Sequence, residues 1–161
     1  MRSKPVLICT AILAITFLSY ENRPQSGHEP GQWHFSFSEV RAYRLNWDHE
    51  EASVGITSQD GSLNPTRIPE AGIRLTAMQV KRLEAAVTGK HPSHRVAMCF
   101  YPHHAFVFFD TNGKIVGHID VCFLCQNYSA EPHGYAHYWD LNELRKLFRE
   151  LEIPLTNSNW T

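Results

Sequence analysis

The strongest constraint on the fold of this chain is an Asn112-Gly113 pair between two runs rich in apolar and β-branched residues. The first run covers residues 104–110 and the second covers residues 115–122. A two-residue type I′ turn requires positive φ at both central positions, which Asn and Gly tolerate better than other residues. The pair therefore predicts a β-hairpin with its turn at residues 111–114.

This turn also predicts which side chains share a face of the hairpin, because opposite residues in an antiparallel pair lie on the same side. Counted from Thr111 opposite Lys114, the expected pairs are Phe109 and Val116, Val107 and His118, Ala105 and Asp120, and His103 and Cys122. One face is mostly apolar and is expected to pack on helices; it holds His104, Phe106, Phe108, Ile115, Gly117, Ile119 and Val121. The other face becomes more polar toward the open end of the hairpin.

Two segments carry the start signals of amphipathic helices. Thr76 followed by Gln79 is a capping box, and the apolar spacing after it predicts a helix over residues 76–88. Asp140 gives a similar start signal for a helix over residues 140–151. The expected buried positions are Val80, Leu83 and Val87 in the first helix, and Leu141, Leu144, Phe148 and Leu151 in the second.

The remaining segments complete a prediction of fold class. Alternating aromatic residues at 33–37 and a β-prone run at 40–45 predict strands, and residues 96–100 predict a further short strand. Turn-forming residues over 58–72 predict a loop. We therefore expect an α+β fold, with a small antiparallel sheet built around the central hairpin (104–122) and packed by the two amphipathic helices.

The size and charge of the chain limit its function class. A chain of 161 residues with 43% hydrophobic and 19% charged residues is long enough for one domain with a buried core. The formal net charge of -1 gives no basis for nucleic-acid binding, which needs a clustered positive surface.

The N-terminus differs in composition from the rest of the chain. Residues 1–20 contain Arg2 and Lys4 followed by an uncharged apolar run, the arrangement of a signal peptide or an N-terminal membrane anchor. Residues 21–32 are rich in Pro and Gly and predict a linker, which leaves residues 33–161 as a single domain. We expect an exported protein of the periplasm or cell envelope, in contact with the membrane if the apolar segment is uncleaved.

The cysteines mark the candidate site. Export would leave Cys99, Cys122 and Cys125 in the mature domain, an odd number in an oxidising compartment. Three thiolates and His103 would form a tetrahedral Cys3His shell, which suits zinc. His103 is preferred to its neighbour because the register places His104 on the core face. On the face that holds Cys122, His118 and Asp120 are expected to support the ligands or to replace one of them.

Other functions remain open from the same residues. Cys122-x-x-Cys125 could form a reversible disulfide resolved by Cys99, or Cys99 could form a structural disulfide with either partner. The cysteines could also be buried as small apolar side chains, or one could act as a nucleophile with His103 and Asp120. A non-catalytic interaction domain would instead use an aromatic surface that includes Trp33, Phe35 or Trp47.

Established catalytic motifs give no further direction. The sequence contains no G-x-S-x-G, H-E-x-x-H, phosphate-binding Gly-rich loop or EF-hand loop. His133 and His137 are predicted to lie in a loop that folds back over the cysteine site. Most other histidines are predicted to be solvated polar residues, namely His28, His34, His49, His91 and His94.

Overall fold

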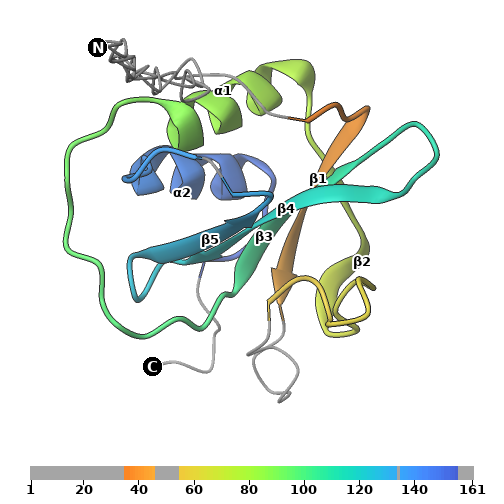
Figure 1. Ribbon diagram of the computed structural model, residues 1–161, viewed down its shortest axis with the longest axis horizontal. Coiled ribbons are helices and arrows are strands. Elements are labelled where there is room, and N and C mark those ends of the chain that lie inside the picture. The colour runs from red at the N-terminus through yellow and green to blue at the C-terminus, as the bar shows by residue number, and fades with distance from the viewer. Residues whose placement is uncertain (1–34, 46–54, 134, 156–161) are drawn as a thin grey trace, which may run out of the picture.

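The computed structural model describes residues 35–45, 55–133 and 135–155. Within these ranges the chain forms a five-stranded antiparallel sheet in the order β2-β1-β3-β4-β5, with two helices on one face (Figure 1). The predicted signal or anchor segment (1–20) and linker (21–32) lie outside the described residues. The α+β class with a small antiparallel sheet is confirmed.

The elements have the following bounds. The strands are β1 (Glu39–Leu45), β2 (Arg67–Arg74), β3 (His104–Phe109), β4 (Ile115–Cys122) and β5 (Asn127–Glu131). The helices are α1 (Ala77–Thr88) and α2 (Leu141–Glu150).

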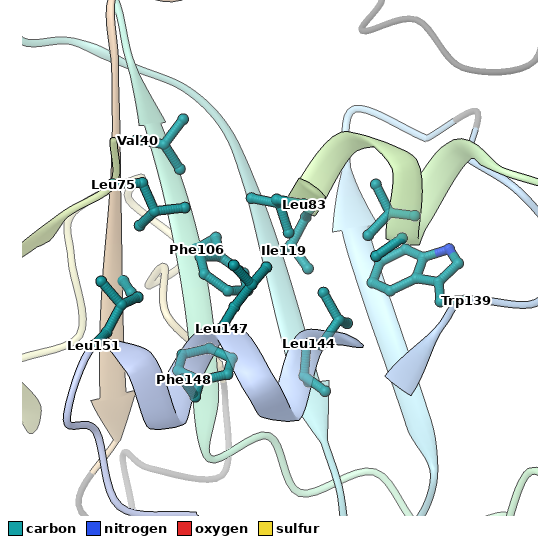
Figure 2. Close-up of a cluster of buried hydrophobic side chains, with 14 of the residues drawn as sticks. Val40, Leu75, Leu83, Phe106, Ile119, Trp139, Leu144, Leu147, Phe148 and Leu151 are labelled. Atoms are coloured by element: carbon teal, nitrogen blue, oxygen red, sulfur yellow. The ribbon is translucent and has the colours of Figure 1, made fainter. Parts of the chain in front are cut away.

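The main core lies between the sheet and the two helices, as Figure 2 shows. Alternation along the strands turns Val40, Phe106 and Ile119 toward the helices, where each is at most 1% exposed. Phe148 of α2 packs on Phe106 with ring centroids 4.5 Å apart. Burial of a large apolar side chain of this kind contributes about 1.5–3 kcal/mol.

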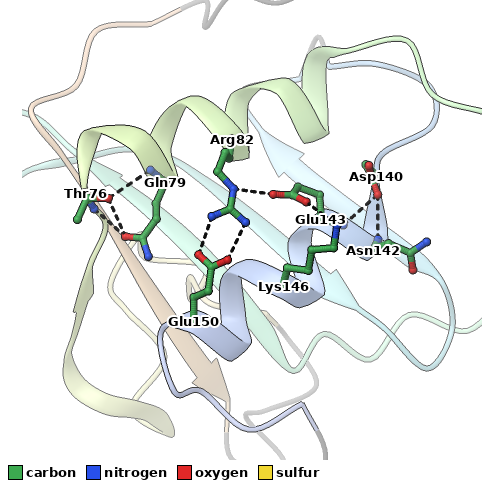
Figure 3. Close-up of polar contacts among 8 residues, drawn as sticks. All are labelled: Thr76, Gln79, Arg82, Asp140, Asn142, Glu143, Lys146 and Glu150. Atoms are coloured by element: carbon green, nitrogen blue, oxygen red, sulfur yellow. Dashed lines mark hydrogen bonds and ion pairs between the residues drawn. The ribbon is translucent and has the colours of Figure 1, made fainter.

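Polar contacts position the helix starts and join the two helices (Figure 3). The Thr76 hydroxyl accepts the Gln79 N–H, and the Gln79 side chain accepts the Thr76 N–H. Across the helix pair, the Arg82 guanidinium binds the carboxylates of Glu143 and Glu150, each at 2.6 Å. These contacts help to set the helix pair over the sheet.

The opposite face of the sheet carries a smaller cluster, covered by residues 55–66 instead of a helix. This cluster consists of Tyr43, Leu45, Ile56, Ala105 and Val107. Asn64 is fully buried and holds the covering segment closed: its amide donates to Gly55 O at 2.8 Å, and its side-chain oxygen accepts the Thr66 N–H at 2.9 Å.

The turn between β3 and β4 differs from the predicted type I′ turn. Asp110 N–H donates to Lys114 O, the Asp110 carboxylate accepts two backbone N–H groups, and in the turn only Gly113 has a positive φ, at 77°. The turn is therefore one residue longer, which places Phe109 opposite Ile115 instead of Val116. A bulge restores the register, so that Val107 lies opposite His118 and Ala105 opposite Asp120.

Three predictions about strands and loops were wrong, and one strand was not predicted. Residues 96–100 form no strand, and residues 35–37 precede β1 without forming one; Phe35 and Phe37 instead pack against Phe108. The predicted loop 58–72 contains part of β2, whose side chains are largely exposed and therefore lack an apolar alternation. β5 was not predicted because its pairing partner, β4, holds it by backbone hydrogen bonds and not by a periodic apolar pattern.

Candidate functional site: three cysteines and a strap along the sheet edge

The C-x-x-C segment forms a tight turn that joins β4 to β5. Cys122 is the last residue of β4, and its sulfur accepts the backbone N–H of Cys125 at 3.3 Å. Gln126 then adopts a left-handed conformation with φ of 50°, which allows the chain to reverse into β5. The turn therefore places two sulfur-bearing residues side by side at the end of the sheet.

The third cysteine comes from residues 89–103, which we call the strap. The strap has no helix or strand and follows the edge of the sheet next to β5, seen as the long green loop in Figure 1. A disulfide joins Cys99 to Cys125, with Cα atoms 5.8 Å apart. Backbone and side-chain hydrogen bonds add to it: Ala97 N–H donates to Cys125 O, and the Asn127 amide donates to Ala97 O and Cys99 O.

Burial of apolar side chains contributes little to holding this part of the strap in place. Val96, Met98 and Tyr101 are 41%, 104% and 57% exposed, whereas core side chains are nearly inaccessible. Phe100 is half-buried, so residues 95–101 are attached by the disulfide, the three hydrogen bonds and this one aromatic side chain.

The structure brings together the three predicted cysteine ligands but gives them different states. Cys99 and Cys125 are bonded, and Cys122 is a buried free thiol. His103 is buried at the end of the strap, and its backbone N–H donates to Val121 O at 3.1 Å. Burial, with smaller contributions from His104 and Arg44, lowers the pKa of His103 to about 2. Among the described residues, no group of three or more His, Cys, Asp or Glu side chains is arranged to hold a metal ion.

His104 lies on the helix side of the sheet. Its ring packs on Phe148 and Phe123, with centroids 4.7 Å and 5.1 Å away, and its Nε2–H donates to Pro154 O at 2.8 Å. Burial lowers the pKa of His104 to about 4, so the ring is neutral at physiological pH.

His118 and Asp120 lie on the face of the sheet covered by residues 55–66. Asp120 is 4% exposed and accepts the Ile56 N–H at 2.8 Å, while its second oxygen lies 3.4 Å from His118 Nε2. Burial raises the pKa of Asp120 to about 7 and lowers that of His118. Thr57 Oγ1 is also 3.4 Å from His118 Nε2.

This Thr57-His118-Asp120 group does not have the geometry of a catalytic triad. In a triad, the base contacts the nucleophile through one ring nitrogen and the orienting carboxylate through the other. Here both partners approach the same Nε2 atom. The group instead attaches the covering segment to the sheet.

A cavity of about 370 Å³ lies between the strap and the N-terminal end of α2. Its lining includes His91 and His94 from the strap, Gln126 from the C-x-x-C turn, and Asn142 and Arg145 from α2. His91 and His94 are half-buried, so the prediction that they are simply solvated was wrong. His91 Nε2–H donates to Ala85 O, and the His94 ring lies between Tyr128 and Tyr138.

Comparison with protein-family models gave no match, and neither curated proteins nor solved structures gave a significant one. In the part of the chain that the structure describes, no helix is both long and apolar enough to cross a bilayer.

Sequence reasoning missed the cavity and the residues that shape it. Arg145 looked like one of several charged residues on an amphipathic helix, and His94 looked solvated. One usable signal was present: residues 89–103 and 122–128 contain Lys90 and Arg95 but no Asp or Glu. These two segments lie beside Arg145 in the folded protein and contain no carboxylate that could pair with its guanidinium.

Proposed function

We propose that this chain is an exported, non-catalytic binding domain in which the Cys99–Cys125 disulfide fixes one wall of a ligand cavity. The hairpin (104–122) and the two amphipathic helices serve as the scaffold, and the strap is the part that the disulfide controls. The observation that carries the proposal is the attachment of the strap by a disulfide while Val96, Met98 and Tyr101 stay exposed.

The energetics support a bracing role for this bond. Cys99 and Cys125 are 26 residues apart in sequence, and closing a loop of that length in the unfolded chain stabilises the fold by about 3 kcal/mol. Disulfides form and persist in exported proteins, which agrees with the expected signal or anchor segment. A fixed cavity wall also lowers the conformational entropy that a ligand would otherwise have to remove on binding.

Amide hydrogen exchange tests this role directly. In a Cys99→Ser variant, we expect the strap amides, including that of Ala97, to exchange at least ten-fold faster, because their exchange would follow local opening. The β3 and β4 amides should change much less. Cys122→Ser is the matched control: it removes a cysteine from the same turn but leaves the disulfide, and strap exchange should stay near that of the parent. Equal strap exchange in Cys99→Ser and the parent would contradict the proposal.

A second candidate function is zinc binding by Cys99, His103, Cys122 and Cys125. His118 and Asp120, which come before Cys122 on the same face of β4, would support these ligands. The observation that favours it is the turn itself, which holds Cys122 and Cys125 close together, with the Cys125 backbone N–H donating to the Cys122 sulfur. Zinc needs the cysteines as thiolates, so this function would require the reduced protein. The metal would stabilise the fold or be passed on if one position stays open.

Thiol counting with metal analysis separates these functions. The protein carries Cys9→Ser, which removes the cysteine of the N-terminal apolar run, and is purified without nickel resin. A Cys99–Cys125 disulfide then predicts one reactive thiol in denaturant before reduction and three after it. A zinc site predicts three thiols without reduction and one equivalent of zinc that Cys122→Ser lowers. Peptide mapping that finds Cys122 bonded to Cys125 would favour a thiol–disulfide exchange protein. The intact mass also reports whether residues 1–20 are removed.

A further inference from the structure

We propose that the cavity between the strap and α2 binds a carboxylate group through Arg145 and His94. This inference rests on the proposed binding function and adds the chemical class of the ligand. The cavity volume of about 370 Å³ falls within the range of about 300–1,000 Å³ that small-molecule sites occupy. Its walls come from two parts of the chain, the strap and α2, that are far apart in sequence.

Arg145 supplies a cation that no carboxylate of the described residues neutralises. Its guanidinium donates to Asn142 Oδ1 at 3.1 Å and to Phe123 O at 3.3 Å, and lies over the Phe123 ring at 5.0 Å. No Asp or Glu of the described residues forms an ion pair with it, and burial lowers its pKa. Arg82 shows the contrast, because it binds two carboxylates.

The existing contacts of Arg145 leave room for a ligand. A guanidinium has five N–H donors, and the two neutral acceptors that contact Arg145 hold it in one orientation without cancelling its charge. A carboxylate can accept two parallel hydrogen bonds from such a planar group.

His94 supplies the second hydrogen-bond donor for the ligand. Its Nε2 atom is buried and has no hydrogen-bond partner among the described residues. The ring is held by Tyr128 and Tyr138, whose ring centroids lie 5.9 Å and 5.4 Å away. A buried polar atom without a partner is costly, and a rotation of the His94 ring toward the cavity that it lines would let a ligand oxygen accept an Nε2–H bond.

Asp140 also lines the cavity, but its carboxylate caps the N-terminus of α2. One oxygen of its carboxylate accepts the N–H groups of Asn142 and Glu143, at 3.1 Å and 2.9 Å, as the N-cap of α2. The positive end of the helix partly offsets this negative charge. Arg145 is therefore the free cation at this site among the residues that the structure describes.

Nuclear magnetic resonance titration of the oxidised, full-length protein tests the inference. The probes are benzoate, a small acid, and N-acetyl-Gly-Leu, a peptide with a free C-terminal carboxylate; benzamide and the peptide amide are their neutral controls. We expect at least one acid, at millimolar concentration, to shift the Arg145 Nε–H signal and the indole signal of Trp139, which also lines the cavity, while its amide does not. The acid that binds more tightly identifies the source of the carboxylate. No shift with either acid, or equal shifts with an acid and its amide, would overturn the proposal.

Three variants assign the contacts. Arg145→Gln should weaken binding about ten-fold or more, since it removes a charge-assisted hydrogen bond. Arg149→Gln is the matched control, because Arg149 is an exposed arginine of the same helix, and its effect should stay below two-fold. His94→Phe keeps the ring contacts and removes Nε2, so it should weaken binding several-fold. An equal loss in both arginine variants would overturn the proposal, and His94→Phe carries the test if Arg145→Gln does not fold.

The result of the acid titration can be distinguished from the hydrogen-exchange test of the proposed function. Loss of acid binding in Cys99→Ser, together with fast strap exchange, would support both proposals. Normal strap protection without acid binding in the parent protein would overturn only the carboxylate site.

Discussion

The two faces of the sheet are closed in different ways. On the helix face, buried residues from strands, helices and connections form a continuous apolar core, part of which Figure 2 shows; 18 of the described residues belong to it. On the opposite face, a cluster of five buried residues is covered by residues 55–66, and polar groups lie directly beside it. Asn64 and Asp120 are both buried there and both bind the backbone of the covering segment.

The difference shows which kind of interaction closes each face. A helix satisfies its own backbone hydrogen bonds, so it can cover a sheet with apolar side chains alone. An irregular segment cannot, and its buried N–H and C=O groups must find side-chain partners. The helix face therefore depends on volume and packing, whereas the loop-covered face depends on particular polar residues.

The largest expected effect comes from removing the same side chain on each face. Leu144 and Leu45 are both fully buried, the first in the helix-face core and the second in the loop-covered cluster. We expect Leu144→Ala to lower the free energy of unfolding by about 4 kcal/mol and Leu45→Ala by about 2–3 kcal/mol, because the irregular cover can collapse further into the space. Urea denaturation measures both, and a larger loss for Leu45→Ala would reverse this part of the comparison.

Loss of a polar anchor should affect the loop-covered face next most strongly. Asn64→Ala leaves Gly55 O and Thr66 N–H without their partner, and we expect a loss of about 2 kcal/mol in the free energy of unfolding. Ser62→Ala, an exposed change in the same segment that removes a contact to Asp60, is the control and should cost about 0.5 kcal/mol or less. Similar values for the two variants would show that the segment is held mainly by its apolar contacts.

The smallest effect is a pH dependence, which has opposite signs on the two faces. The pKa of Asp120 rises from its ordinary 3.8 to about 7 on folding, so its contribution to stability is full below pH 3.8 and is lost as the pH rises through about 7. His104 has the opposite sign: burial lowers its pKa from 6.5 to about 4, and its contribution is lost as the pH falls through that range.

An Asp120→Asn variant isolates the carboxyl group, since the amide oxygen can still accept the Ile56 N–H. Its stability relative to the parent should increase between pH 6 and pH 8 by on the order of 1 kcal/mol, because only the folded parent loses a proton from residue 120 there. Thermal unfolding of both proteins at several pH values measures the difference. A difference that stays constant with pH would show that Asp120 ionises normally in the folded protein.

Part of the candidate site could be predicted from sequence. The apolar runs on either side of Asn112-Gly113 indicated the sheet, and the spacing of Cys122 and Cys125 indicated a turn with two sulfurs at its end. The sequence allowed a disulfide between Cys99 and either Cys122 or Cys125 but could not decide between them, because the choice depends on where the strap crosses the sheet edge. Arg145 and His94 were missed for the same reason, since only the assembled fold places them in one cavity.

The sequence by itself determined the α+β class, because helical and strand periodicities and capping residues are local properties of the chain. It also determined that three cysteines would fall in a short stretch between the helices. Only the tertiary structure decided the order of the strands, the bulge that corrects the β3–β4 register, the strand β5 and the path of the strap. These features depend on backbone pairing and on one disulfide between distant residues, for which no short stretch of sequence carries a pattern.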